Sequence, residues 1–177
     1  MGKKSRQYIG LLSAIIAYYI IHEGAHLVYA LITGAFKEIK FMKLGMQIDI
    51  YSDRFTDQQM CVFCIVGSAA TFVTAYLLVF LAGKIVKAKS KPFRACMYYI
   101  TITMLFLDPL YLSLLCGFFG GGDMNEISLL IPEIAARIGY GVLLIVNMFV
   151  FIKVVLPKYK SAFEGNATKN ERTDSNI

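Results

Sequence analysis

The chain has 177 residues, of which 57% are hydrophobic and 17% charged, and its mean hydropathy is +0.59. This composition excludes a typical water-soluble globule, a disordered chain, a collagen and a small disulfide scaffold. The net charge is +6. In so apolar a chain, an excess of Lys and Arg indicates the cytoplasmic loops of a membrane protein, so we expect no nucleic-acid partner.

Four apolar segments are long enough to cross a bilayer, given the ~20 residues that ~30 Å of hydrocarbon requires. They cover residues 8–33, 60–83, 95–119 and 138–156. Inside lipid no water is present to satisfy backbone N–H and C=O groups, so each segment is expected to be a helix. The sequence therefore predicts an all-α polytopic membrane protein with about four transmembrane helices.

The Lys and Arg residues are divided unevenly between the two predicted sides of the membrane. Residues 1–7, 84–94 and 157–172 carry most of them, whereas the other two connections carry few. The positive-inside rule then places both termini in the cytoplasm of a multi-pass protein, which we expect in the cell membrane. The first segment exceeds a normal signal peptide and lacks an obvious cleavage site, so we expect an uncleaved signal anchor.

Two shorter regions lie between the predicted spans. Residues 36–51 alternate between apolar and polar side chains, which predicts a short β-hairpin at the membrane face, between the first two helices. Residues 123–137, interrupted by Pro132, predict a short interfacial helix. We expect residues 1–156 to form one integral-membrane domain and residues 157–177 to be a polar, disordered tail.

The four cysteines all lie in apolar segments, where cysteine commonly packs as a small hydrophobic residue. They are Cys61, Cys64, Cys96 and Cys116. Cys61 and Cys64 form a C-x-x-C pair, but no second pair and no histidine lies nearby in the sequence. We therefore expect packing roles and no disulfide framework.

The only two histidines of the chain, His22 and His26, lie in the first predicted span with Glu23 beside the first. Together they form H-E-x-x-H. Residues four apart share one face of a helix, so both imidazoles can reach one metal ion, and Glu23 is close enough to act as a general base on water. Catalytic zinc typically takes three protein ligands and leaves the fourth position to water, so Zn²⁺ is the expected metal.

A less specific interpretation of this motif is a buried His/Glu pair that only stabilises helix packing, since H-E-x-x-H also occurs by chance in soluble helices. Charged groups at the centre of a bilayer cost roughly 2–3 kcal/mol each even on the lenient insertion scale. Three ionisable residues within one turn of a span are therefore expected to serve a function.

Two aspartates compete to be the third ligand. Asp108 lies well inside the third span, next to Pro109, where its alternative role is a cap or packing contact. Asp123 follows the glycine run at 120–122, which would allow the backbone to fold back into the protein, and its alternative role is that of an ordinary surface acid. A carboxylate oxygen suits zinc beside two imidazoles, and the residues alone leave both candidates open.

With these features the chain resembles the site-2 protease family of intramembrane zinc metalloproteases, as a small, divergent member. The resemblance covers most of residues 8–156. It consists of the H-E-x-x-H in a membrane helix, the hairpin after it, the small residues 67–70 in the second helix and an aspartate after the third. It implies that His22, His26 and a downstream aspartate bind zinc and that Glu23 is the catalytic base. It favours Asp123 as the third ligand, because residues 122–125 look like the glycine-flanked aspartate of small members.

The resemblance implies an endopeptidase that cuts transmembrane or membrane-proximal segments of membrane proteins within the lipid bilayer. An extended substrate could add as a strand to the edge 46–50 of the hairpin. A transmembrane substrate must unwind before it is cut, so helix-breaking residues in the substrate should matter. The compact size suggests recruitment by a regulatory membrane partner.

Two other hypotheses remain open. In one, His22, His26 and an aspartate bind or transport a divalent cation without proteolysis. In the other, the four helices form a scaffold that holds no metal.

Overall fold

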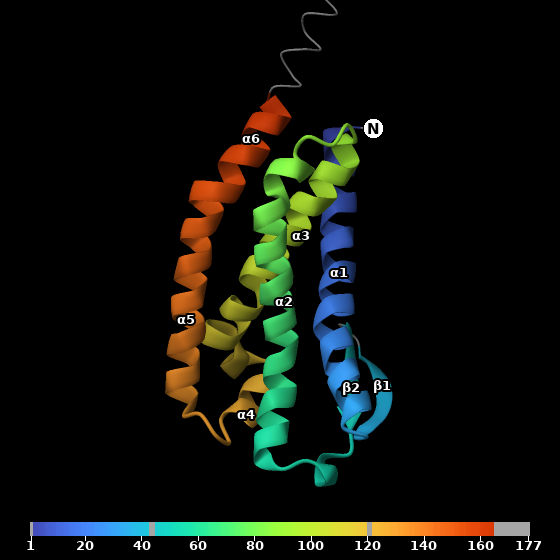
Figure 1. The fold of residues 1–177 in the computed structure, drawn as a ribbon, viewed down its shortest axis with the longest axis vertical. Coiled ribbons are helices and arrows are strands. Elements are labelled where there is room, and N and C mark those ends of the chain that lie inside the picture. Colours follow the sequence, from blue (N-terminus) through green and yellow to red (C-terminus); the bar gives the residue numbers. More distant parts are fainter. Residues whose placement is uncertain (1, 43–44, 120–121, 165–177) are drawn as a thin grey trace, which may run out of the picture.

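Four long helices form the body of the molecule, because each apolar segment satisfies its backbone as a helix (Figure 1). They are α1 (Lys3–Ile32), α2 (Asp57–Ile85), α3 (Lys91–Leu110) and α5 (Glu133–Val150). This computed structural model describes residues 2–42, 45–119 and 122–164. The four helices, with the turns that extend α3 and α5, are long and apolar enough to cross a membrane, which confirms the predicted set of apolar helices.

Local capping defines where two of these helices begin. Thr56 accepts a hydrogen bond from the backbone of Gln59, whose side chain accepts one from the backbone of Thr56, so the pair forms a capping box before α2. Ser90 caps α3 by accepting a hydrogen bond from the Phe93 backbone N–H, and Pro92 lies in the first turn.

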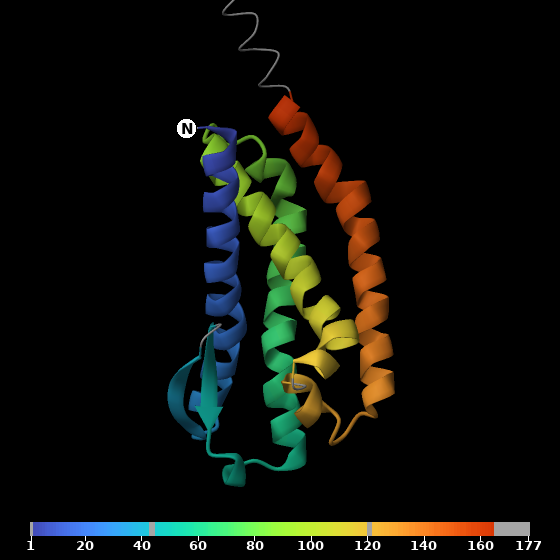
Figure 2. The same ribbon diagram turned by 180° about the vertical axis from the view of Figure 1, so that it is seen from behind.

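The predicted hairpin is present as β1 (Phe36–Met42) and β2 (Gly45–Ile50), paired antiparallel with Ile39 opposite Ile48. It folds back along α1 (Figures 1 and 2), and its place at the membrane face stays a prediction. Packing explains why it folds back. Ile48 is buried in a core cluster with Ala30 of α1 and Phe63 of α2.

The chain after α3 is irregular. Pro109 lies in the last turn of α3, which continues as a π-helical turn (Tyr111–Leu115) and a 3₁₀ turn (Cys116–Phe118). The short helix α4 (Asp123–Ile127) follows and packs against α2. Gly122, which precedes it, has a φ of 50°, a backbone conformation that residues other than glycine rarely adopt. This path returns the chain to the interior with Asp123 at the start of α4.

Two boundaries differ from the sequence prediction. The interfacial helix expected over 123–137 ends at Ile127, and α5 begins at Glu133 directly after Pro132, because proline has no N–H to donate and suits the start of a helix. The fourth apolar helix is therefore longer at its start than the predicted segment 138–156.

The tail expected to be disordered from residue 157 begins as a helix, α6 (Leu156–Glu164), which continues α5 through a π-helical turn at Phe151–Val155. Tyr159 is 1% exposed and packs against Tyr98 of α3, and the Ala162 carbonyl accepts a hydrogen bond from the buried Arg94. The expectation was wrong for residues 157–164, because these contacts order the segment. Residues 165–177 lie outside the described part of the chain.

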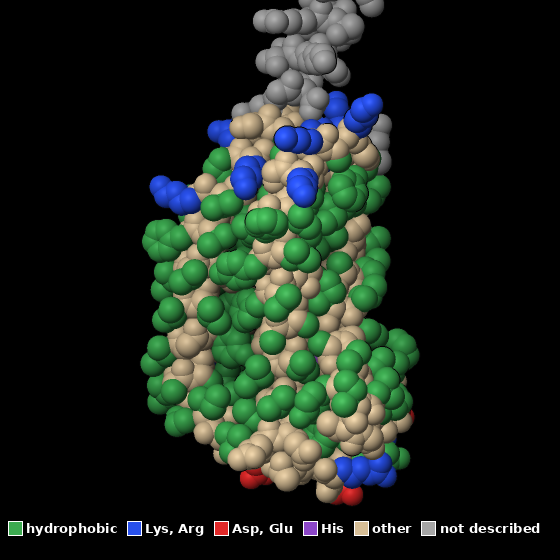
Figure 3. Space-filling view, in the orientation of Figure 1, with side chains coloured by type: hydrophobic (Ala, Val, Ile, Leu, Met, Phe, Trp, Pro, Cys, Tyr) green, Lys and Arg blue, Asp and Glu red, His purple; other side chains and the backbone are tan. Residues whose placement is uncertain are grey.

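The ends of the bundle differ in charge. Lys and Arg side chains gather at the end that carries the N-terminus, the α2–α3 connection and α6, and a broad hydrophobic belt lies below them (Figure 3). Both ends of the described chain thus lie at one end of the bundle. The side of a membrane that this end faces stays a prediction.

Candidate metal centre

The two histidines lie on the inner face of α1, as their spacing predicts. His22 is 6% exposed and His26 is 3% exposed, and their Nε2 atoms are 3.2 Å apart. Both Nε2 atoms therefore converge on one point inside the bundle. Residues four apart on a helix place their side chains in this way without any distortion of the backbone.

Asp123 completes the group from the start of α4. Its Oδ2 lies 3.5 Å from Nε2 of His22 and 3.7 Å from Nε2 of His26. Burial raises the pKa of Asp123, but hydrogen bonds and charge from the two imidazoles outweigh it and hold the pKa below its usual range, so this carboxylate is ionised at neutral pH. These three partly or fully buried side chains could hold a metal ion.

Gly67 of α2 leaves open the space in front of the two imidazoles. A Cβ atom at this position would lie 2.7 Å from Nε2 of His22 and closer still to Nε2 of His26. Any larger residue would therefore crowd both Nε2 atoms, the two imidazole donors of the group. This open position lies within the small-residue segment 67–70 noted in the sequence.

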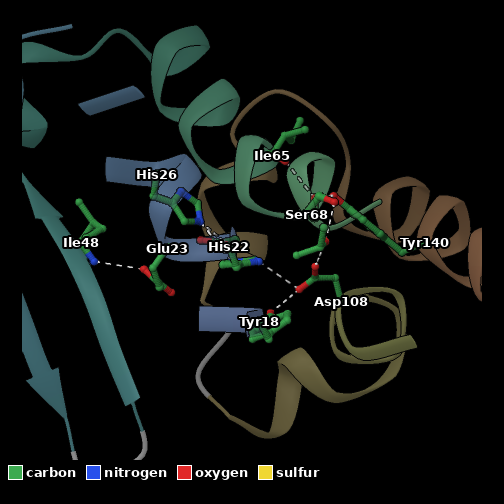
Figure 4. A network of polar contacts seen from close by, with 11 residues as sticks. Tyr18, His22, Glu23, His26, Ile48, Ile65, Ser68, Asp108 and Tyr140 are labelled. Carbon is green, nitrogen blue, oxygen red and sulfur yellow. Dashed lines mark hydrogen bonds and ion pairs between the residues drawn. The ribbon is translucent and has the colours of Figure 1, made fainter. Parts of the chain in front are cut away.

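Asp108, the other candidate ligand, lies on the far side of the His22 ring. Its Oδ1 is 3.3 Å from Nδ1 of His22, the nitrogen opposite to the one that faces Asp123. Asp108 also accepts hydrogen bonds from Tyr18 (2.5 Å, to Oδ1) and from Thr71 (to Oδ2). The structure thus brings both aspartates to His22, but only Asp123 to the group of three converging atoms (Figure 4 shows the Asp108 side).

Glu23 points away from the histidines toward the hairpin, where its Oε2 accepts a hydrogen bond from the backbone N–H of Ile48 at 3.3 Å (Figure 4). The carboxylate is partly buried between α1 and β2. One carboxylate oxygen of Glu23 is thereby held by the hairpin and is not directed at the three converging donor atoms.

Sequence reasoning missed three contributors to this site. Tyr18 precedes His22 by four residues and so shares its helix face, a signal that was available. Thr71 is a polar residue in an apolar segment, which is a weaker signal. The Ile48 N–H is a backbone group of the hairpin, and no sequence pattern could have identified its contact with Glu23.

Comparison with known proteins gives no relative for this chain. No protein-family model, no curated protein and no solved structure matches it.

Proposed function

We propose that the protein is a zinc-dependent intramembrane endopeptidase of the site-2 protease type, which hydrolyses peptide bonds in or near transmembrane segments of other membrane proteins. The observation that carries this proposal is the H-E-x-x-H on a long apolar helix, with both Nε2 atoms and Asp123 converging on one buried point. We propose further that the four apolar helices span the lipid bilayer, as a multi-pass protein of the cell membrane with both termini in the cytoplasm.

Zinc fits the donor set. Two imidazoles and one carboxylate are ligands of catalytic zinc sites. Zinc bonds of about 2.0–2.1 Å at tetrahedral angles separate neighbouring donor atoms by about 3.3–3.4 Å. The three separations here are 3.2, 3.5 and 3.7 Å, so His22, His26 and Asp123 would hold the ion with small adjustments. Zinc bound there supplies a Lewis acid that activates water for attack on a carbonyl carbon.

Glu23 is the general base in this proposal. The hydrogen bond from Ile48 fixes Oε2, which leaves Oε1 to take the proton of the attacking water and to deliver it to the leaving amine nitrogen. The Glu23 carboxylate is turned toward the hairpin, but it still interacts electrostatically with His22, His26 and Asp123, so it lies near the three donor atoms. Its partial burial keeps the carboxylate away from bulk water, where a proton would be lost to solvent.

An extended substrate added at the Met46–Ile50 edge of β2 would lie next to Glu23. The Ile48 N–H points toward α1 and donates to Glu23, so this is the edge of β2 that faces the site. Ile48 is buried against α1, so a substrate strand requires the hairpin to move away from that helix. A membrane partner that recruits substrate would act at this step.

The test is cleavage of a tagged transmembrane substrate co-expressed with the wild type, with Glu23→Gln and with Glu38→Gln, an exposed hairpin residue, as the control. We expect the wild type and the control to cut, and Glu23→Gln to keep its zinc but lose cleavage by a factor of about 10² or more. Cleavage by Glu23→Gln at the wild-type rate would exclude the protease. Zinc flux into liposomes that does not depend on Glu23 would favour the cation-transport hypothesis instead.

A further inference from the structure

We propose that Asp108 is a positioning residue of the metal centre, which holds the His22 ring so that Nε2 points at the ion. The proposal rests on the metal site of the proposed function and adds a role to a residue outside the ligand set. In this proposal Asp108, which is held by Tyr18 and Thr71, orients the ring of His22 and not that of His26.

The first step is the side of the ring that Asp108 contacts. Oδ1 lies 3.3 Å from the buried Nδ1 of His22, an ion-pair contact, and Nδ1 makes no hydrogen bond to any of the described residues. A ligating histidine usually places its second ring nitrogen against a carboxylate or carbonyl, which fixes the tautomer and the ring orientation. Asp108 is the carboxylate in that position.

The second step is that Asp108 is itself held. Tyr18 donates to Oδ1 at 2.5 Å and Thr71 donates to Oδ2, so the two oxygens are fixed from α1 and α2 while the residue belongs to α3. The Tyr18 ring also stacks on His22, with centroids 5.1 Å apart and planes at 26°. Three helices thus fix one imidazole through one carboxylate (Figure 4).

The third step is the cost of placing a carboxylate there. Asp108 is 2% exposed and lies within one of the apolar helices, where a carboxylate is retained only with compensation. A packing role would be met by an apolar residue of similar volume, without this cost. A negative charge facing a histidine that ligates a cation is compensated by that cation.

His26 provides the internal reference. Its Nδ1 is also buried, and it has neither a carboxylate contact nor a hydrogen-bond partner among the described residues. The chain has only two histidines, so protein labelled with ¹⁵N-histidine gives ring signals from His22 and His26 alone. A change confined to His22 therefore reports on Asp108 directly.

The experiment uses full-length protein in detergent and compares the wild type with Asp108→Asn and Tyr18→Phe. Zinc affinity is measured by competition with a chelator, and the ¹⁵N ring signals are recorded with zinc bound. We expect Asp108→Asn to weaken zinc binding by about 10- to 100-fold and to move the Nδ1 signal of His22 but not that of His26. Tyr18→Phe should give a smaller change of the same sign.

Matched controls are Ser113→Ala and Tyr76→Phe, which each remove one hydrogen-bonded hydroxyl of the bundle that does not contact His22. Both should retain wild-type affinity. If Asp108→Asn does not fold, the zinc affinity of Tyr18→Phe, compared with that of Tyr76→Phe, still tests whether the contacts of Asp108 position His22.

Wild-type affinity and unchanged His22 signals in Asp108→Asn and Tyr18→Phe would overturn the proposal. So would complete loss of zinc in Asp108→Asn with retention in Asp123→Ala, because Asp108 would then be a ligand. A wild type that binds no zinc removes this proposal and the proposed function together. Cleavage is not a readout here, so a protein that binds zinc but cuts nothing removes only the proposed function, and the affinities still test Asp108.

Discussion

The side-chain amide of Asn147 in α5 donates a hydrogen bond of 2.6 Å to the backbone carbonyl of Leu105 in α3. Leu105 precedes Pro109 by four residues, and proline has no N–H, so this carbonyl has lost its helical donor. Asn147 replaces the missing bond and accepts one from Tyr76 of α2, so three helices meet at a single buried amide, which is 0% exposed.

Replacing Asn147 by leucine should destabilise the protein. The Leu105 carbonyl would be left buried without a partner, at a cost of about 1–3 kcal/mol, and the Tyr76 hydroxyl would lose its acceptor. Denaturant unfolding in detergent micelles should show this loss, and Tyr76→Phe should cost less because it removes only one bond. Equal stability of Asn147→Leu and the wild type would contradict the role of Asn147 at the α3 break.

Replacing Gly67 by alanine should empty the metal centre. The added methyl would lie 2.7 Å from Nε2 of His22 and closer still to Nε2 of His26, so it would crowd both imidazole donors. We expect elemental analysis to show a fall from about one zinc per chain to near zero. Gly83→Ala on the same helix, whose Cβ would contact nothing within 4 Å, is the control and should keep its zinc. Full zinc content in Gly67→Ala would place the ion elsewhere.

Replacing Asp123 by alanine should weaken zinc binding, because it removes the proposed third ligand. We expect zinc to be lost on dialysis against a chelator that leaves the wild type loaded, because two imidazoles alone bind zinc more weakly than a three-ligand site. Glu126→Ala, which removes a carboxylate from the same short helix, should behave like the wild type. Retention of zinc by Asp123→Ala would show that another group completes the site.

Replacing Arg94 by glutamine should release α6. Arg94 donates to the Val86 carbonyl at 3.4 Å and the Ala162 carbonyl at 3.1 Å, and its guanidinium lies 5.8 Å from the centre of the Phe163 ring. We expect faster proteolysis within residues 157–164, with cleavage of the rest of the bundle unchanged. Lys89→Gln changes an exposed cation of the neighbouring connection and should leave the proteolysis rate as it is. Equal proteolysis rates for the wild type and Arg94→Gln would show that Arg94 does not hold α6 in place.

The sequence was sufficient for the long helices, the hairpin and the pairing of His22 with His26, because each rests on a local period or on the length of an apolar run. The residues alone left the choice between Asp108 and Asp123 open, and only the family resemblance favoured Asp123. Both reach the same imidazole, and which nitrogen each contacts depends on how α3 and α4 pack. The helix over residues 157–164 was missed for a similar reason. A polar composition predicts disorder, whereas this segment is ordered by tertiary contacts of Tyr159 and Arg94 that composition does not report.

In the proposed protease, the position of the histidines along α1 would determine the fate of the cut substrate. His26 and His22 precede Ile32 by six and ten residues, which at about 1.5 Å per residue is about 9–15 Å from the end of the helix. With α1 spanning the bilayer as proposed, a substrate helix cut at that depth keeps about six to ten membrane residues on one fragment. About 20 apolar residues are needed to anchor a helix across the bilayer. The short fragment would therefore leave the membrane on the side away from the termini. The other fragment, also too short to span, would stay at the opposite leaflet.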